Sequence, residues 1–320
     1  MVGLLLERLA QRPGMLAITG ATGWVGRTAV AELARLLPHP LLAERLWLFA
    51  SCSGSIQIGD RILPVHPLRA LPELATTHSL AAVMHTAFLT RDRLAVVGQE
   101  AYVATNRWIT QQVAEALSLA PAARAVVISS GAAADYDAGT DPNSHLEADP
   151  YGVLKREEEL VLARLASCLV LRIYALSGYF IRDPARFALG DFLLSALQGQ
   201  PIRIKASMPV LRSYGHAGDI TALAWRWLLS DDDPLAPQSM PAVSAQLNLF
   251  NLAQRITELY SLPPVQATID PLAAANIYLS DSAPFLEALA RFGLSARSLN
   301  EQVRDTAAGL IANPDGTLGR

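Results

Sequence analysis

The chain has 320 residues, of which 51% are hydrophobic and 17% are charged, a composition typical of a compact globular protein and not of a disordered one. The formal net charge is −3 and there is no basic tract, which argues against a nucleic-acid-binding surface. The two cysteines, Cys52 and Cys168, lie far apart and have no metal-ligand spacing, so we expect no metal site and a reduced, cytoplasmic environment. The apolar run at residues 4–6 is too short and too close to charged residues to span a membrane; an amphipathic helix is expected within residues 1–14.

From residue 15 onward, short apolar runs alternate with helical patterns. Strands are predicted at residues 15–19, 46–50, 80–86, 125–129 and 168–173. Helices are predicted before residue 37 and at residues 102–118 and 151–165. The apolar runs are continuous, not alternating, which is typical of parallel strands covered on both faces. The pattern therefore predicts an α/β fold with a doubly wound parallel sheet.

After Gly178 the regular alternation ends. Helices are predicted at residues 187–197, 220–229, 252–260 and 285–292, with an extended stretch at 202–204. We therefore expect a smaller, less regular C-terminal region beside the main sheet.

Three glycines follow the first predicted strand and open the helix after it. In such a turn one glycine permits the tight bend, one lets the backbone approach a pyrophosphate, and one lets the helix pack on the strand. The helix N-terminus adds N–H groups and the positive end of the helix dipole. The turn therefore predicts a dinucleotide site, whose residues would be Gly20, Thr22, Gly23, Trp24, Val25 and Gly26.

The second predicted strand ends without a carboxylate that could bind the ribose 2′-hydroxyl of NAD. The small side chains of Ser51 and Ser53 leave room for a 2′-phosphate, and Arg27 or Arg61 would supply charge to it. NAD and NADP both stay open, and the arginines favour NADP.

Lys155 is one of only two lysines in the chain, and it follows Tyr151 by four positions. Composition alone predicts roughly 0.05 Tyr-x-x-x-Lys pairs in a chain like this one. On a helix this spacing puts both side chains on one face. An ammonium beside a phenol lowers the phenol pKa from about 10 and makes the tyrosine a general acid or base. The alternative is a packed tyrosine beside a solvated lysine.

Two serines, Ser129 and Ser130, end the predicted strand that precedes the Tyr151 helix. Ligands of a doubly wound sheet bind at the carboxyl ends of its strands, so a serine there can face the same pocket as Tyr151. The acidic run at residues 157–159 is expected on a solvated face of that helix.

The glycine turn, the strand-end serines and the Tyr-x-x-x-Lys pair, in this order, resemble the short-chain dehydrogenase/reductase family. More specifically, the chain resembles the extended branch of that family, the NAD-dependent epimerase/dehydratase group. The segments that carry the resemblance are Thr19–Gly26, His85–Ala87, Asn106, Leu171–Gly178, Arg212–Ile220, Tyr278–Asp281 and Arg297–Arg304.

The resemblance implies a role for each site residue. Tyr151 would exchange a proton with the substrate hydroxyl or carbonyl while hydride moves to or from nicotinamide. Lys155 would bind the nicotinamide ribose and lower the pKa of Tyr151. Ser130 would hydrogen-bond the same substrate oxygen, with Ser129 as the alternative. The remaining residues expected at the cofactor are Ser51, Ser53, Thr86, Ala87 and Asn106. Those expected at the substrate are Arg212, Ser177 and Arg182, for which an exposed loop arginine is the alternative.

One departure from the family pattern bears on the reaction. Dehydratases of this family carry an Asp-Glu pair just after the catalytic hydroxyl, where this chain has Gly-Ala-Ala-Ala at residues 131–134. The resemblance therefore implies a nucleotide-sugar 4-epimerase or ketoreductase and disfavours dehydration. A reductase of a non-sugar carbonyl compound and a catalytically silent NAD(P)-binding regulator are the alternatives.

The resemblance also implies the domain organisation. We expect residues 1–178 to form a dinucleotide-binding domain, to which residues 211–250 return. Residues 179–210 and 251–320 would form a substrate-binding region. A homodimer formed through helices of the main domain is expected, and Trp108 on the predicted helix 102–118 is compatible with it.

Overall fold

The computed structural model describes residues 8–9, 12–137, 142–230 and 239–313. The chain forms two compact units, the first made of residues 1–172 and 221–240 and the second of residues 173–220 and 241–320. The first boundary therefore falls after residue 172 and not after residue 178. Of residues 211–250, which were expected to return to the first unit, only residues 221–240 belong to it. Most of the helix expected in residues 1–14 lies outside the described residues.

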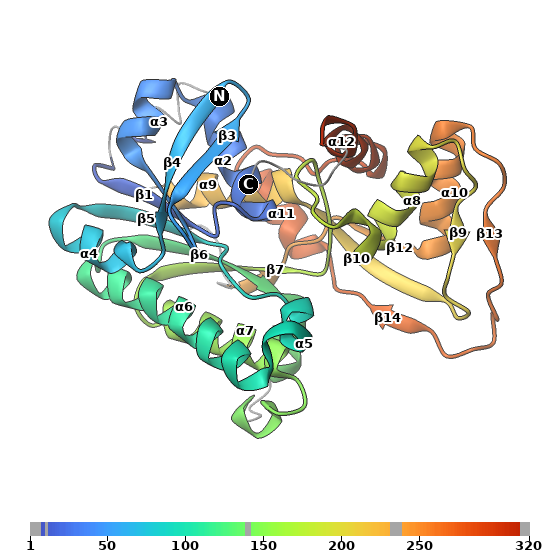
Figure 1. Ribbon diagram of the computed structural model, residues 1–320, viewed down its shortest axis with the longest axis horizontal. Coiled ribbons are helices and arrows are strands. Elements are labelled where there is room, and N and C mark those ends of the chain that lie inside the picture. The colour runs from blue at the N-terminus through green and yellow to red at the C-terminus, as the bar shows by residue number, and fades with distance from the viewer. Residues whose placement is uncertain (1–7, 10–11, 138–141, 231–238, 314–320) are drawn as a thin grey trace. The chain divides into compact units, whose positions relative to one another are not determined.

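The first unit contains an eight-stranded sheet in the order β11-β7-β6-β5-β1-β2-β4-β3 (Figure 1). β1 pairs in parallel with β2 and β5, β5 pairs in parallel with β6, and β2 pairs in parallel with β4. The chain moves outward from β1 to β2 and β4 and then crosses to the other side of β1, which is the doubly wound order that the sequence predicts. The strands are β1 (Met15–Thr19), β2 (Leu46–Ala50), β3 (Gly54–Ile58), β4 (Arg61–Pro67), β5 (Leu80–His85), β6 (Arg124–Ser130), β7 (Ser167–Ile173) and β11 (Ser239–Pro241).

Helices cover both faces of this sheet (Figure 1). In one layer, α6 contacts both α4 and α7. α2 and α9 lie together in the other, where Trp225 Nε1 of α9 donates a 2.9 Å hydrogen bond to Ala29 O of α2. The helices of this part of the chain are α2 (Trp24–Leu36), α3 (His39–Arg45), α4 (Ala70–Thr77), α5 (Leu94–Val97), α6 (Gln99–Leu119), α7 (Pro150–Ala163) and α9 (Ala217–Leu228), with 3-10 turns η1 (Arg91–Arg93), η2 (Gly131–Tyr136) and η3 (Pro142–His145).

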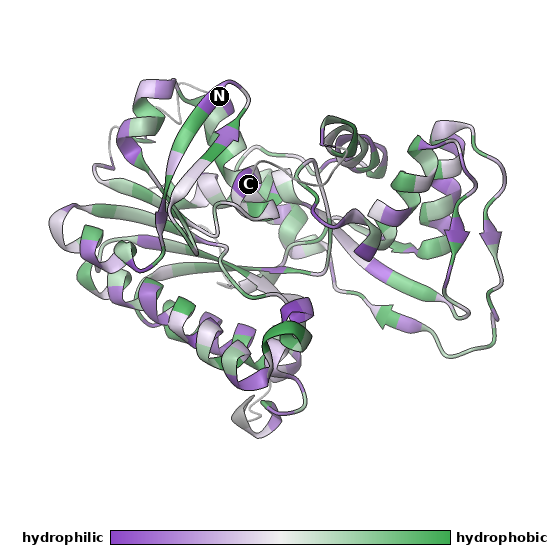
Figure 2. Cartoon of the chain, viewed as in Figure 1, coloured by the Kyte–Doolittle hydropathy of each residue, from purple (hydrophilic) through white to green (hydrophobic). Residues whose placement is uncertain are grey.

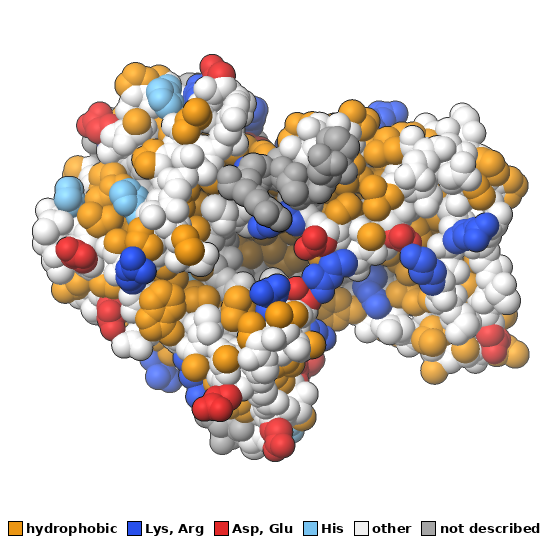
Figure 3. All heavy atoms as spheres, in the orientation of Figure 1, with side chains coloured by type: hydrophobic (Ala, Val, Ile, Leu, Met, Phe, Trp, Pro, Cys, Tyr) orange, Lys and Arg blue, Asp and Glu red, His pale blue; other side chains and the backbone are white. Residues whose placement is uncertain are grey.

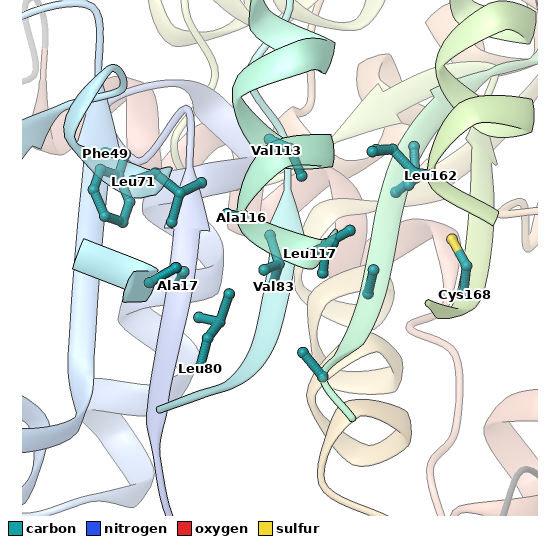
Figure 4. Packing of buried hydrophobic residues seen from close by; sticks show 14 of the residues in the cluster. Ala17, Phe49, Leu71, Leu80, Val83, Val113, Ala116, Leu117, Leu162 and Cys168 are labelled. Carbon is teal, nitrogen blue, oxygen red and sulfur yellow. The ribbon is translucent and has the colours of Figure 1, made fainter. Parts of the chain in front are cut away.

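The apolar core explains why the strands read as continuous apolar runs. Ala17 of β1 and Val83 of β5 pack toward Val113 and Leu117 of α6 (Figure 4). Side chains alternate along a strand, so Ile18 faces the opposite layer, and it is buried as well. Figure 2 shows the same division, with hydrophobic strands inside and hydrophilic residues along the outer sides of the helices. Burial on both faces is thus the physical basis of the sequence pattern.

The hairpin of β3 and β4 was not predicted from the sequence. These strands pair antiparallel at the edge of the sheet, and Gly59 at the turn between them has φ +61°. Their side chains alternate between buried and exposed, as expected for an edge hairpin with one solvated face. A search for continuous apolar runs does not detect such strands.

The second unit contains smaller sheets and four longer helices. β10 lies between β12 and β14 and also pairs with β8, while β9 and β13 form a separate parallel pair. α12 begins with a capping box formed by Ser298 and Glu301. The elements are β8 (Ala175–Ser177), η4 (Pro184–Arg186), α8 (Ala188–Leu197), β9 (Arg203–Ile204), β10 (Val210–His216), β12 (Ala245–Asn248), α10 (Leu249–Tyr260), β13 (Gln266–Ala267), β14 (Asn276–Tyr278), α11 (Ala283–Arg291) and α12 (Leu299–Ala312).

The surface is mixed in charge. On the face shown in Figure 3, acidic and basic side chains are interspersed among apolar and neutral ones. Within the described ranges, no helix combines the length and the apolar character needed to cross a bilayer.

Gly309 in α12 tests the packing of the second unit. A Cβ at this position would overlap the backbone oxygen of Tyr179. We therefore expect Gly309→Ala to lower the free energy of unfolding by about 1–3 kcal/mol in chemical denaturation, although alanine is the better helix former. Gly54→Ala is the control, because a Cβ there meets nothing within 4 Å. Equal stability of the two variants would contradict the close packing of α12.

Candidate active site

The glycine turn lies directly against the segment that follows β5. Gly20 has φ +69°, and a Cβ there would lie 2.7 Å from Ala87 N. Thr86 Oγ1 donates a 2.7 Å hydrogen bond to Thr19 O. A Cβ on Gly26 would overlap Gly20 O. The turn thus needs glycine at both positions, and it meets residues 86–87 where the direction of the chain switches in the sheet.

The N-terminus of α2 fits an anionic group. Its N-cap is Gly23, which has no side chain to cap the helix, and the first turn contains no acidic residue. The dipole and the N–H groups of such a turn favour an anion such as a phosphate. These features, with the glycine cradle, fit the pyrophosphate of a dinucleotide.

The expected roles of Arg27 and Arg61 at a 2′-phosphate are wrong. Arg27 is buried, and its Nε donates a 3.2 Å hydrogen bond to Thr22 O within the turn. Arg61 Nη1 donates to Ala34 O at 2.6 Å and to Leu37 O at 2.9 Å, which places it at the C-terminal end of α2. Both guanidinium groups bind backbone carbonyls, so the sequence argument that favoured NADP no longer holds. Ser51 and Ser53 are exposed just after β2.

The structure brings Ser130, and not Ser129, to Tyr151. Tyr151 lies in the first turn of α7, where Asp149 caps the helix by accepting a hydrogen bond from Gly152 N. Ser130 at the end of β6 hydrogen-bonds to the Tyr151 side chain. Ser129 instead donates a 2.6 Å hydrogen bond to Glu159 Oε1 and is buried.

Lys155 makes three contacts that the sequence did not predict. Its Nζ donates to Ile128 O at 3.0 Å and to Glu158 Oε2 at 2.9 Å. It also lies 3.9 Å from the centroid of the Phe88 ring. The ammonium is therefore paired with a carboxylate, which cancels much of its effect on the phenol.

The pKa of Tyr151 is accordingly raised above its ordinary value. Burial is the largest cause, and the charges of Glu158 and Asp149 add to it. The hydrogen bond from Ser130 and the charge of Arg91 lower the pKa but do not outweigh burial. In the protein alone, the lowering that was expected from Lys155 therefore does not outweigh burial.

The acidic run on α7 is not a solvated face. Glu158 and Glu159 are 1% and 2% exposed, and only Glu157 lies toward solvent, where it pairs with Arg107 at 2.6 Å. Glu159 accepts hydrogen bonds from Arg172 Nε at 2.8 Å and Nη2 at 2.6 Å. Residues 151, 155, 158 and 162 fall on one helical stripe, and this spacing was the available sign that Glu158 faces inward.

Two residues near Tyr151 were missed in the sequence. Phe88 packs edge-on against Tyr151, with ring centroids 5.8 Å apart, and the guanidinium carbon of Arg91 lies 4.9 Å from the Tyr151 centroid. Asn106 acts on the loop that carries them, because its Oδ1 accepts a 2.8 Å hydrogen bond from Leu89 N. The only feature of the sequence that places Phe88 and Arg91 near Tyr151 is their position just after His85–Ala87.

The three residues expected at the substrate lie in the second unit. Arg212 binds Asn276, with Nη1 2.9 Å from its backbone oxygen and Nη2 2.9 Å from its Oδ1. Arg182 is exposed after β8. Ser177 is 0% exposed, and its Oγ lies 2.9 Å from Gln302 Oε1, so the expectation that Ser177 contacts substrate is wrong.

Within the described ranges, no group of three or more His, Cys, Asp or Glu side chains could hold a metal ion. Cys168 in β7 is buried, which raises the pKa of its thiol to about 12 and keeps it protonated.

The fold is shared with solved structures. The chain is similar to epimerase Mth375 of Methanothermobacter thermautotrophicus, with 17% identity, a TM-score of 0.70, and coverage of 98% of this chain and 96% of that one. It is similar to a UDP-glucose 4-epimerase of Thermotoga maritima with UDP-glucose, with 16% identity, a TM-score of 0.67 and coverage of 94% and 99%. It is also similar to MoeE5 in complex with UDP-glucose and NAD, with 21% identity, a TM-score of 0.65 and coverage of 94% and 100%. At these identities the likeness shows the fold alone.

No curated protein matches the sequence. The family model described as "NAD dependent epimerase/dehydratase family" matches residues 16–240, more than two thirds of the chain. Together with the doubly wound sheet and the glycine turn, this match shows that the chain belongs to the NAD-dependent epimerase/dehydratase family.

Proposed function

We propose that the protein transfers hydride between a nicotinamide dinucleotide and a hydroxyl or keto carbon of a nucleotide sugar, as a 4-epimerase or a ketoreductase. The observation that carries the proposal is the hydrogen bond between Ser130 and Tyr151 at the carboxyl end of β6. It pairs a proton donor with a hydroxyl that can orient the same substrate oxygen. The bound cofactor would supply or accept the hydride.

Each residue has a separate part in this chemistry. Tyr151 holds the proton that the substrate oxygen gains on reduction or loses on oxidation. Ser130 donates a hydrogen bond to that oxygen and stabilises charge that develops on it. Lys155 is the residue proposed to face the nicotinamide ribose.

Two observations support this choice of reaction and substrate. Residues 131–134 (Gly-Ala-Ala-Ala) supply no carboxylate beside Ser130, so an elimination lacks its acid and base. Similar structures carry UDP-glucose, which favours a nucleotide-linked sugar. A reductase of a non-sugar carbonyl would use the same Ser130–Tyr151 pair, and a catalytically silent NAD-binding regulator would not need it. Protection of the protein from thermal unfolding by a nucleotide sugar would distinguish a nucleotide-sugar enzyme from both of these alternatives.

A homodimer and a cytoplasmic location stay predictions. Trp108 on α6 is 43% exposed, and α7 also exposes Leu160 and Val161, which gives these helices apolar surface for a second copy.

The cofactor proposal favours NAD, because Arg27 and Arg61 both bind carbonyls. We expect NAD to raise the melting temperature in a thermal-shift assay, and NADP to raise it less. Val25→Glu, which puts a negative charge in the first turn of α2, should remove the NAD effect by repelling the pyrophosphate. Val25→Gln is the uncharged control. A shift with NADP alone would overturn the preference, and no shift with either would overturn the dinucleotide site.

The serine and tyrosine variants test the catalytic assignment. Tyr151→Phe should lower kcat by at least about 100-fold, and Ser130→Ala should lower it by about 10- to 100-fold. Ser129→Ala should instead lower stability by about 1–3 kcal/mol, because it removes a buried hydrogen bond to the carboxylate of Glu159. Steady-state rates and denaturation curves measure the two effects. Unchanged turnover in Tyr151→Phe would refute the proposed chemistry.

The raised pKa of Tyr151 predicts different pH profiles for the two directions. Oxidation of the hydroxyl needs the phenolate, so its kcat/KM should rise about tenfold per pH unit across the neutral range, where the phenolate is the minor form. Reduction needs the phenol and should be nearly independent of pH there. The rising limb should disappear in Tyr151→Phe. A flat oxidation profile in the wild-type protein would show that Tyr151 is not the base.

A further inference from the structure

Glu158 is a buried carboxylate between two ionisable side chains from different elements. Its Oε2 accepts the 2.9 Å hydrogen bond from Lys155 Nζ, one helical turn earlier on α7. Its Oε1 lies 2.8 Å from His85 Nε2 at the end of β5. The side chain of Glu158 is 0% exposed, so solvent does not screen either contact.

His85 connects Glu158 to the glycine turn. The other ring nitrogen of His85, Nδ1, lies 2.6 Å from Thr19 Oγ1. Thr19 Oγ1 also accepts hydrogen bonds from Thr86 N and Ala87 N, so its own proton is directed to His85 Nδ1. The His85 ring therefore lies between Thr19 Oγ1 and the carboxylate of Glu158. Glu158 thus contacts Lys155 directly, and it is connected to the start of the glycine turn through His85 and Thr19.

Lys155 is held on three sides. A carbonyl oxygen, a carboxylate and the face of Phe88 surround its Nζ. Contacts of these kinds restrict the position of the ammonium.

The fold alone does not require an acid at this position. A buried ion pair is often no more stabilising than apolar residues of similar volume, whereas one partner left alone costs about 3–5 kcal/mol. Leu162, the next residue on the same stripe, is an ordinary apolar core residue. A carboxylate at residue 158 is explained by the buried ammonium of Lys155, for which it is the counterion in this chain.

We propose that Glu158 is a positioning residue of the Tyr151–Lys155 pair, which holds the Lys155 ammonium in place and cancels its charge, so that Tyr151 stays a neutral proton donor. The catalytic role of Glu158 rests on the proposed function, whereas its contacts with Lys155 and His85 are independent of that function. Tyr151 is reached by other charges as well, so their effect must be held constant in any test. The ionisable groups around Glu158 and Tyr151 are Lys155, Asp149, His85, Arg91, Tyr102 and Cys168.

Replacement of Glu158 by its uncharged isostere tests the charge. We expect Glu158→Gln to lower the pKa of Tyr151 by at least about 0.5 unit, because a negative charge that raises this pKa is removed. Carbon-13 labelling of the tyrosine ring carbons lets NMR follow Tyr151, whose signal is the one missing in Tyr151→Phe. Glu157→Gln removes the same charge from the neighbouring surface residue and is the matched control. An equal pKa of Tyr151 in the two glutamine variants would overturn the proposal.

The wild-type protein tests the position of Lys155. The chain has only two lysines, and Lys205 is exposed beside Asp191. The ε-methylene protons of Lys155 should be shifted upfield of those of Lys205 by the ring current of Phe88, and Phe88→Leu should remove the shift. If Glu158→Gln does not fold, this spectrum decides: coinciding signals of the two lysines would overturn the proposal.

Measurements of turnover distinguish a failure of this inference from a failure of the proposed function. If the protein oxidises a nucleotide sugar, the rising limb of kcat/KM should move to lower pH in Glu158→Gln by the same amount as the pKa of Tyr151. An unmoved limb would overturn the positioning role while leaving the activity established. If no nucleotide sugar turns over, the proposed function fails, and the two NMR measurements still decide the role of Glu158.

Discussion

The parallel pairing of β1 with β5, and of β5 with β6, is the constraint on which the candidate site depends. In a parallel sheet all carboxyl ends lie at one edge, so the ends of these strands bring Thr19, His85 and Ser130 to that edge. The chain switches direction between β1 and β5, which opens the edge to a ligand. Gly20 then allows the turn after β1 to approach the backbone of Ala87. A side chain there would separate the two halves of the site.

Burial imposes a second constraint on the same edge. Each charged group brought to the carboxyl ends must find a partner, because an unpaired charge in the core costs several kcal/mol. Two neighbouring groups of paired side chains meet this requirement: Glu158 of α7 pairs with Lys155, and Glu159 of α7 pairs with Arg172 of β7. Ser129 joins the second group and Ser130 does not. The two adjacent serines thus have different partners because side chains alternate along a strand: Ser129 faces Glu159, whereas Ser130 faces Tyr151.

The sequence was sufficient for the fold and for the residue types at the site, and insufficient for their electrostatics. Continuous apolar runs and the glycine turn depend on burial and backbone geometry, and both can be predicted from the pattern of neighbouring residues. The surroundings of Tyr151 include Phe88 and Arg91, which lie more than fifty residues earlier in the chain. The spacing of Tyr151 and Lys155 correctly places them on one helix face, but it cannot show that the ammonium turns toward Glu158. Ser177 was misjudged for the same reason, since its partner Gln302 is distant in sequence.

The protonation of Tyr151 bears on the choice between the two proposed reactions. An epimerase oxidises and then reduces one carbon, so its tyrosine must begin the cycle as a phenolate and recover that form at the end. A ketoreductase begins with the phenol, which gives its proton to the new hydroxyl. Burial and the charge of Glu158 both raise the pKa of Tyr151 and so favour the phenol in the resting protein. The ammonium that would favour the phenolate is already paired. The resting protein therefore holds Tyr151 in the protonated form that the proposed reduction would use.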